Sequence, residues 1–342
     1  MYGFMSEKTK NKLIGTLAAV LYMSMPYHLN DMYIRNALGE FLSYIFIPLV
    51  FRGIDQLLNQ KNGNHFLVVG ATGLILTHNL MTLLTGIFAS LYLLIHIKQL
   101  RNKKCLLNLL ITIGFILGIT SFFWIPALET LNFADYEVYQ KNSMATTNSF
   151  INASLSLKEL LFTSRHSTFI FEIGIPIIVI LLLSFLCIPF LTKKFTNAKE
   201  YFFFLSLGIL CVWMSTKYFP WKFLGNYFNI IQFPWRLLVF SNFFFSIICS
   251  INLGILLKNF RFFHLVALSI IIIFYLATLI KFLPTSSQVL DIKYHYLTGI
   301  SVYENVAMPA LGKGEYLPVN SNKNRSYLFF REDTVSVLSG KR

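Results

Sequence analysis

The sequence predicts an all-α polytopic membrane protein, a bundle of about nine transmembrane helices, on three observations. Hydrophobic residues make up 55% of the chain and charged residues only 13%, and long stretches almost lack ionisable side chains. Those stretches also lack the strict alternation of a membrane β-barrel, so helices are expected to satisfy the backbone hydrogen bonds. At about 1.5 Å per residue, each can cross a hydrocarbon core of about 30 Å. The clearest of them are 106–126, 169–191, 237–257 and 262–280.

The N-terminal third holds shorter apolar runs. Lysines at positions 8, 10 and 12 predict a cytoplasmic start, followed by a span at 13–28. The chain would turn outside near Asn30 and return through a span at 38–58. Residues 65–97 are too long for one untilted span, and Thr77-His78-Asn79 interrupts them. They predict two short helices that meet near the outer face at His78.

Basic loops set the orientation of the remaining chain. Residues 98–104 carry four basic side chains, which the positive-inside rule places in the cytoplasm. This predicts a cell-membrane protein with a cytoplasmic N-terminus and an extracytoplasmic C-terminus, and membrane lipid as its first partner. Since these loops account for the net charge of +14, no nucleic-acid partner is expected. The expected spans are then 105–126, 169–191, 200–216, 235–257 and 262–283.

Two domains follow from these spans. Residues 1–283 are expected to form the transmembrane helical domain, with a long outer loop at 127–168. Residues 284–342 are expected to be an extracytoplasmic, β-leaning tail, because polar residues return and 326–330 and 334–338 alternate like strands. The chain stops right after a strand-like run and opens on what resembles the end of an apolar element. It is therefore expected to be a fragment of a longer protein, truncated at both ends.

Charged residues near the first predicted turn need an explanation, because a charge inside the bilayer costs about 2.5–3.5 kcal/mol. Asp31 and Arg35 are four residues apart and share one helix face. Either Asn30 or Asp31 caps a helix and Asp31 pairs with Arg35, or these residues form a site. In a site, Arg35 would grip a phosphate, and a carboxylate would orient an acceptor hydroxyl or hold a divalent cation. Glu40 lies inside the next apolar stretch and should have a partner such as Arg35 or His78.

Two further places carry polar candidates. His78 and Asn79 lie where a helix breaks, and exposed backbone groups there could hold an ion or phosphate. Alternatively, His78 is a core histidine that stabilises the break. Trp235 is typical of an aromatic belt, and Arg236 either binds the phosphate of a lipid carrier or reaches lipid headgroups. The sequence has no metal-ligand spacing and no nucleotide-binding motif. The candidate catalytic residues are the two carboxylates near the first turn, Asp31 and Glu40.

Several motifs resemble a bacterial family of polytopic membrane proteins that is labelled 6-pyruvoyl-tetrahydropterin synthase-related and is similar to GT-C glycosyltransferases. The resemblance runs from about residue 12 to 318. The motifs are Pro26-Tyr27-His28-Leu29-Asn30-Asp31-Met32-Tyr33-Ile34-Arg35 with Gly39-Glu40, the Thr77-His78-Asn79 break, Gln232-Phe233-Pro234-Trp235-Arg236, and Gly314-Glu315-Tyr316-Leu317-Pro318.

The resemblance implies a GT-C-like bundle that takes a sugar from a polyprenyl-phosphate carrier at the extracytoplasmic face. Asp31 or Glu40 would orient the acceptor, Arg35 and Arg236 would bind phosphate, and His78 would shape the pocket. Members tend to have earlier membrane segments that could carry the usual acidic loop, which makes Asp31 a second-choice acid. Because the seven histidines include no HxH pair, pterin chemistry is not expected.

Three functions fit these features. The chain could be a glycosyltransferase that decorates a cell-surface polymer of the envelope. It could be a transporter or flippase of a lipid-linked saccharide that uses the broken helix at His78. It could also be a non-catalytic scaffold subunit of a surface-polymer complex. The sequence does not distinguish the three, nor does it identify the sugar, the acceptor or the oligomeric state.

Overall fold

The computed structural model describes residues 1–61, 63–133, 153–161, 171–182, 198–228 and 231–256, with six single residues between 269 and 280. This part of the chain is helical and includes one isolated bridge between Leu155 and Thr216. The chain divides into two units: Met1–Phe123 with Phe150–Phe282, and Trp124–Ser149 with Leu283–Arg342. The first unit holds every predicted site residue. The predicted β-leaning tail, 284–342, lies outside the described residues.

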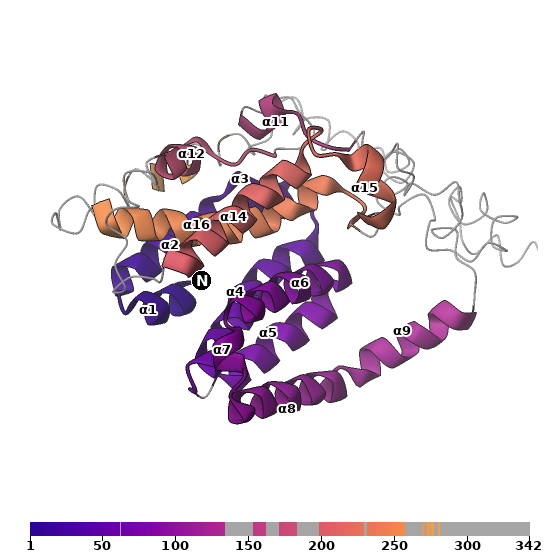
Figure 1. The fold of residues 1–342 in the computed structure, drawn as a ribbon. Helices are drawn as coiled ribbons and strands as arrows, with labels where there is room; N and C mark the ends of the chain where they lie inside the picture. Colours follow the sequence, from indigo (N-terminus) through magenta and orange to yellow (C-terminus); the bar gives the residue numbers. More distant parts are fainter. Residues whose placement is uncertain are drawn as a thin grey trace, which may run out of the picture. The chain divides into compact units, whose positions relative to one another are not determined.

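The helices of the first unit form two groups by their packing, and Figure 1 labels their members. In one, α4 packs against α5, and α8 packs against α5; in the other, α16 contacts α2 and α14. Their bounds are α1 (Tyr2–Thr9), α2 (Lys12–Ser24), α3 (Pro26–Tyr33), α4 (Leu38–Leu58), α5 (Asn64–Thr77), α6 (Asn79–Ile95), α7 (Ile97–Leu100), α8 (Lys103–Ile119), α9 (Ser121–Phe133), α11 (Leu157–Leu161), α12 (Ile175–Leu182), α14 (Ala198–Ser215), α15 (Trp221–Phe228), the 3₁₀ turn η4 (Pro234–Leu237) and α16 (Leu238–Leu256).

The first predicted span is broken in the structure. Met25 is extended between α2 and α3, and Pro26 is the first residue of α3, where its missing N–H removes no helical hydrogen bond. Asn30 and Asp31 both lie inside α3, so the alternative in which one of them caps a helix is wrong. The chain turns only at residues 34–37, where Asn36 has a positive φ.

Three described helices are long and apolar enough to cross a membrane: α4, α14, and η4 joined to α16. They confirm the predictions at 38–58, 200–216 and 235–257. The span expected at 105–126 is bent in the structure, because α8 and α9 meet at an angle of 64° at Thr120. The bent pair could be a fourth span. The nine-span count stays a prediction, since about half of 169–191 and most of 262–283 lie outside the described residues.

The predicted break at His78 is confirmed. α5 ends at Thr77 and α6 begins at Asn79, while His78 is extended with φ −159° and ψ 105°. Its Nδ1 accepts a hydrogen bond of 3.4 Å from the backbone N–H of Met81, so the imidazole caps α6.

Exposed and buried side chains are arranged as expected for helices in lipid. The exposed side of α8 is apolar, with Leu107, Leu110 and Ile111 each more than half exposed. Helix α16 is mostly buried and carries polar groups on its inner surface: Asn242 donates to Tyr44 and Asn252 accepts from Tyr201. Apolar exteriors with interhelical polar contacts are typical of membrane bundles.

Glycines allow α4 and α5 to approach closely. A Cβ at Gly53 would lie 2.5 Å from the backbone nitrogen of Leu67, and one at Gly70 would lie 2.7 Å from that of Val50. The neighbours are backbone atoms, so they cannot rotate away. This is the small-residue contact by which membrane helices pack.

We expect Gly70→Ala to destabilise the protein by about 1–3 kcal/mol, because the added methyl forces α4 and α5 apart. The matched control is Gly114→Ala in α8, where a Cβ would meet nothing within 4 Å. There the same substitution should stabilise the helix by about 0.5–1 kcal/mol. Thermal unfolding of both variants in one detergent measures the difference, and equal shifts would contradict the close packing of α4 on α5.

Candidate functional site

Five side chains, four of them charged, come from α3, the turn after it, α4 and η4 and form one buried group, here called the Arg35 cluster. Tyr27 and Asp31 are on α3, four residues apart and therefore on one face. Arg35 follows in the turn, Glu40 lies in the first turn of α4, and Arg236 comes from η4. The sequence predicted that Asp31, Arg35 and Glu40 would be partners, and the structure joins them to Arg236.

Arg35 is at the centre of the cluster. Its Nη1 lies 2.6 Å from Asp31 Oδ1, 2.8 Å from the hydroxyl of Tyr27 and 3.2 Å from Glu40 Oε1. The predicted pair between Asp31 and Arg35 is confirmed, although Asp31 is an interior residue of α3 rather than a cap. One guanidinium therefore compensates two carboxylates that would be costly without it.

Glu40 is held from both sides. Its Oε1 accepts a 2.6 Å hydrogen bond from the hydroxyl of Tyr27, and its Oε2 lies 3.5 Å from Arg236 Nε. Arg236 also donates through Nη1 to the side chain of Gln232 and to the carbonyl of Ile231. Glu40 was expected to have a partner such as Arg35 or His78. This expectation is confirmed, because Arg35 and Arg236 both lie within ion-pair distance of its carboxylate.

The cluster has an inner and an outer layer. The side chains of Asp31 and Glu40 are 0% and 1% exposed, whereas Arg35 and Arg236 are each 13% exposed. Within the described residues, Asp31 Oδ2, Glu40 Oε2 and Arg236 Nε make no hydrogen bond. Burial raises the pKa of Asp31 well above its usual value, and the charge of Glu40 raises it further. An incoming anion would thus meet the arginines first and the carboxylates behind them.

A row of aromatic rings lies beside the charges. Trp235 stacks on Phe233 with ring centres 4.6 Å apart and meets Phe171 in a tilted contact at 5.0 Å, and Phe171 stacks on Tyr27 at 6.1 Å. The indole Nε1 of Trp235 is buried and has no hydrogen-bond partner among the described residues. Aromatic faces with an available N–H suit a ligand that is partly apolar and carries hydroxyl groups.

His78 lies at the edge of the cluster. A Cβ on Gly39 would come 2.5 Å from the carbonyl of Thr77 and 3.4 Å from His78 Cδ2, so the helix break packs against the residue before Glu40. The charges of Glu40, Arg236 and Arg35 reach its imidazole. Asn79 is exposed and makes no hydrogen bond to the cluster among the described residues.

Sequence reasoning missed two members of this site. Tyr27 connects both carboxylate-bearing helices, and its spacing of four residues from Asp31 could have indicated it. Gln232 orients Arg236, which is four residues further along the chain. Among the described residues, no group of three or more His, Cys, Asp or Glu side chains could hold a metal ion.

A second buried group of charges was also missed. In the Lys8 cluster, Lys8 Nζ lies 2.6 Å from Asp55 Oδ1 and 2.5 Å from Glu200 Oε2. Tyr92 donates to the same Asp55 oxygen at 2.9 Å, and His96 Nε2 lies 2.9 Å from Glu200 Oε1. The cluster joins α1, α4, α6 and α14 at the end of α4 opposite Glu40.

The chain is similar in sequence to a protein family and to a bacterial relative. Residues 2–285 match the model of a family described as "6-pyruvoyl-tetrahydropterin synthase related domain; membrane protein". An uncharacterized protein of Lactococcus lactis subsp. cremoris (strain MG1363) is 28% identical over 233 residues. That alignment covers 64% of this chain but only 36% of the relative, so the chain spans about a third of the relative's length. No solved structure matches the chain.

Proposed function

Since this chain belongs to the family of 6-pyruvoyl-tetrahydropterin synthase related membrane proteins, we propose that it acts within the membrane as a GT-C-like glycosyltransferase. In this proposal, it transfers a sugar from a polyprenyl-phosphate carrier to a cell-surface polymer. The N-terminus is cytoplasmic, and the Arg35 cluster faces the extracytoplasmic side. Activity, substrate and orientation are all parts of the proposal.

The layered arrangement of the Arg35 cluster is the observation that supports this proposal. Arg35 and Arg236 are the more exposed members, and their ion-pair partners are carboxylates. A phosphate that binds them competes for the same guanidinium groups, and guanidinium matches phosphate geometry. Binding of the carrier would therefore release Asp31 or Glu40 from its partner at the moment when a base is needed.

The released carboxylate has a defined task. It accepts the proton of the acceptor hydroxyl while that oxygen forms a bond to the anomeric carbon of the sugar. The bond from that carbon to the carrier phosphate breaks, and the phosphate leaves with its negative charge between Arg35 and Arg236. Burial, and next the charge of Glu40, raise the pKa of Asp31, and perturbed pKa values are typical of groups that exchange protons in catalysis. A divalent cation at the released carboxylates is compatible with this scheme but not required by it.

Apolar surfaces near the cluster suit the other parts of the carrier. A cavity of about 540 Å³ lies between α12, α14 and α16 and is lined almost wholly by apolar side chains, Trp213 and Phe245 among them. It reaches Thr216, whose neighbour Ser215 donates to the carbonyl of Pro234, next to Trp235. A hydrocarbon chain in this cavity would bring its phosphate toward Arg236, and the aromatic row would contact the sugar.

Transfer of radiolabelled sugar from polyprenyl phosphate to a wall-polymer fraction tests the proposal. We expect Asp31→Asn and Glu40→Gln to reduce transfer by about 10²–10³-fold, as is usual when a proton-transfer or charge-stabilising group is lost. The matched control is Glu129→Gln on the exposed side of α9, which should leave transfer unchanged. Unfolding temperatures in detergent separate a lost reaction from a lost fold. Transfer should require donor on the extracytoplasmic side of oriented vesicles.

Transfer that survives in both Asp31→Asn and Arg236→Ala would contradict these roles.

The broken helix at His78, which packs against Gly39, favours a flippase as the second candidate. Movement of lipid-linked saccharide across sealed vesicles without a new glycosidic bond would identify that activity. A scaffold subunit would instead co-purify with an enzyme and bind no donor itself.

A further inference from the structure

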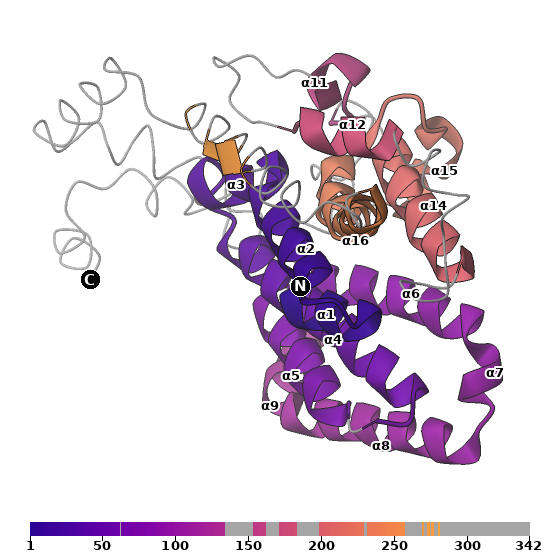
Figure 2. The ribbon, with the colours of Figure 1, turned by 90° about the vertical axis from the view of Figure 1, so that its left-hand side faces the viewer.

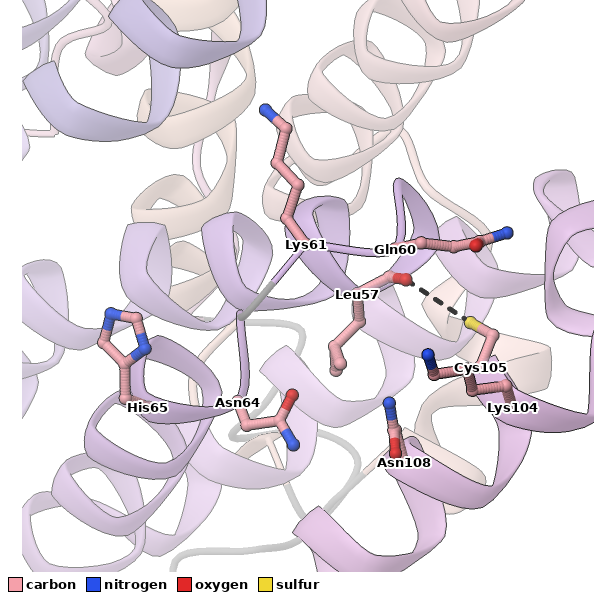
Figure 3. A pocket seen from close by; sticks show the side chains of 8 residues that line it. All are labelled: Leu57, Gln60, Lys61, Asn64, His65, Lys104, Cys105 and Asn108. Atoms are coloured by element: carbon pink, nitrogen blue, oxygen red, sulfur yellow. Dashed lines mark hydrogen bonds between the residues drawn. The ribbon is translucent and has the colours of Figure 1, made fainter.

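A second cavity lies at the opposite end of α4 from the Arg35 cluster. It has a volume of about 500 Å³, within the usual range for sites that hold a small molecule or headgroup. It forms at the corner where α4 ends and where α5 and α8 begin, as Figure 3 shows. Figure 2 shows the same three helices from the side. The lining residues are Leu57, Gln60, Lys61, Asn64, His65, Lys104, Cys105 and Asn108.

The lining combines an apolar floor with polar and basic walls. Leu57 and Cys105 are buried, and the Sγ of Cys105 donates to the carbonyl of Leu57. The side chains of Lys104 and Asn108 lie on α8 beside this floor. Lys61 points away in Figure 3, and its Nζ lies 3.2 Å from Glu7. Lys104 has no carboxylate within ion-pair distance among the described residues.

The backbone adds positive potential to that of Lys104. Both α5, of 14 residues, and α8, of 17 residues, begin at this corner. The N-termini of helices carry partial positive charge on their unpaired N–H groups. Two such ends, the Lys104 ammonium and the amides of Asn64 and Asn108 converge on one cavity, which is the chemistry that holds a phosphate.

The face of α8 below the cavity indicates what carries that phosphate. Lys104, Asn108, Ile111 and Phe115 are spaced four, three and four residues apart and therefore lie along one stripe of the helix. Ile111 and Phe115 are 58% and 59% exposed. A free phosphate would not contact the apolar half of this stripe. A phospholipid would contact both halves, because its headgroup lies at Lys104 and its acyl chain packs on Ile111 and Phe115.

We propose that this cavity binds the phosphate headgroup of an anionic phospholipid, with one acyl chain along Ile111 and Phe115. The site is separate from the proposed glycosyl-transfer site and does not depend on it. It also goes beyond the general attraction of basic loops to anionic membranes, because it assigns the phosphate to one cavity and one lysine. The bound lipid would link α4, α5 and α8 at the end of α4 where Arg52 and Asp55 lie.

Native mass spectrometry of the purified full chain with added dioctanoyl phosphatidylglycerol tests this proposal. We expect Lys104→Gln to raise the dissociation constant about tenfold, a change of one decade in affinity. The control is Lys103→Gln, the same charge change one residue away on α8, outside the cavity. It should alter the constant less than twofold. Dioctanoyl phosphatidylcholine should bind at least tenfold more weakly to the unchanged protein.

A second pair of variants distinguishes a lipid from a free anion. Ile111→Ser should weaken phosphatidylglycerol binding, while Ile113→Ser, also exposed on α8 but on the side opposite the stripe, should not. Inorganic phosphate should compete only weakly with the lipid. Equal losses in Lys104→Gln and Lys103→Gln would overturn the proposal, because they indicate diffuse charge attraction. Tight binding of inorganic phosphate without lipid binding would overturn the assignment to a phospholipid.

Discussion

Replacing Arg35 with methionine is expected to lower the free energy of unfolding by about 3–5 kcal/mol, the usual cost of removing one partner from a buried ion pair. The side chain has nearly the same volume, so the loss comes from charge. Without the guanidinium, Asp31 and Glu40 are two buried carboxylates, and of the two arginines only Arg236 stays near them. Thermal and denaturant unfolding in one detergent measures the change.

Two further variants show whether the stability lost in Arg35→Met comes from the broken ion pairs. Arg101→Met makes the same chemical change at an exposed position and should shift stability by less than about 0.5 kcal/mol. Asp31→Asn combined with Arg35→Met should recover part of the loss, because one of the stranded charges is then gone. A double variant as unstable as the sum of the single ones would show that Asp31 and Arg35 do not depend on each other.

The part of the site that could be predicted depends on short separations along the chain. Asp31 and Arg35 share a helix face at a spacing of four, which a sequence displays directly. Glu40 was predicted to have a partner because an unpaired carboxylate in an apolar stretch is costly, and Arg35 is that partner. Tyr27 could have been included by the same spacing rule, since it precedes Asp31 by four residues.

Contacts between distant segments could not be predicted in the same way. Arg236 was expected on the same side as Asp31, but its pairing with Glu40 depends on how η4 packs against α4. Lys8 was interpreted as a signal for a cytoplasmic start, although it is buried between two carboxylates 47 and 192 residues away. Only the packing of four helices brings these groups together, and no local pattern encodes it.

Helix ends also differ in how far the sequence predicts them. The boundaries of α4 follow from its apolar content, and the break at His78 follows from three consecutive polar residues. The break at Met25 and Pro26 was missed, because a proline alone does not mark a helix end: Pro48 lies inside α4. The 64° bend at Thr120 coincides with the polar pair Thr120-Ser121, a weaker marker than the three consecutive polar residues at the His78 break.

The Lys8 cluster leads to the second large expected effect. Burial alone would lower the pKa of Lys8, but the electrostatic interactions with Tyr92, Asp55 and Glu200 outweigh it and hold the pKa well above its usual value. The ammonium is therefore charged in the folded protein. Lys8→Met should lower the free energy of unfolding by about 3–5 kcal/mol, because Asp55 and Glu200 lose the cation between them.

The matched control is Lys12→Met, an exposed lysine at the start of α2, which should change stability by less than about 0.5 kcal/mol. Asp55→Asn combined with Lys8→Met should be more stable than Lys8→Met alone. If Lys8→Met and Lys12→Met are equally stable in the same detergent, Lys8 contributes no more than an exposed charge, and the cluster does not hold its helices together.

The position of the Lys8 cluster predicts how the loss of Lys8 affects sugar transfer. Glu40 and Asp55 lie 15 residues apart on α4, which is about 22 Å at the rise of an α-helix. One straight helix thus carries a buried ion-pair group near each end, and the Lys8 cluster fixes the end that is remote from the proposed chemistry. Loss of Lys8 should therefore reduce sugar transfer only as far as it reduces folded protein, whereas Glu40→Gln should reduce transfer by about 10²–10³-fold in protein that remains folded.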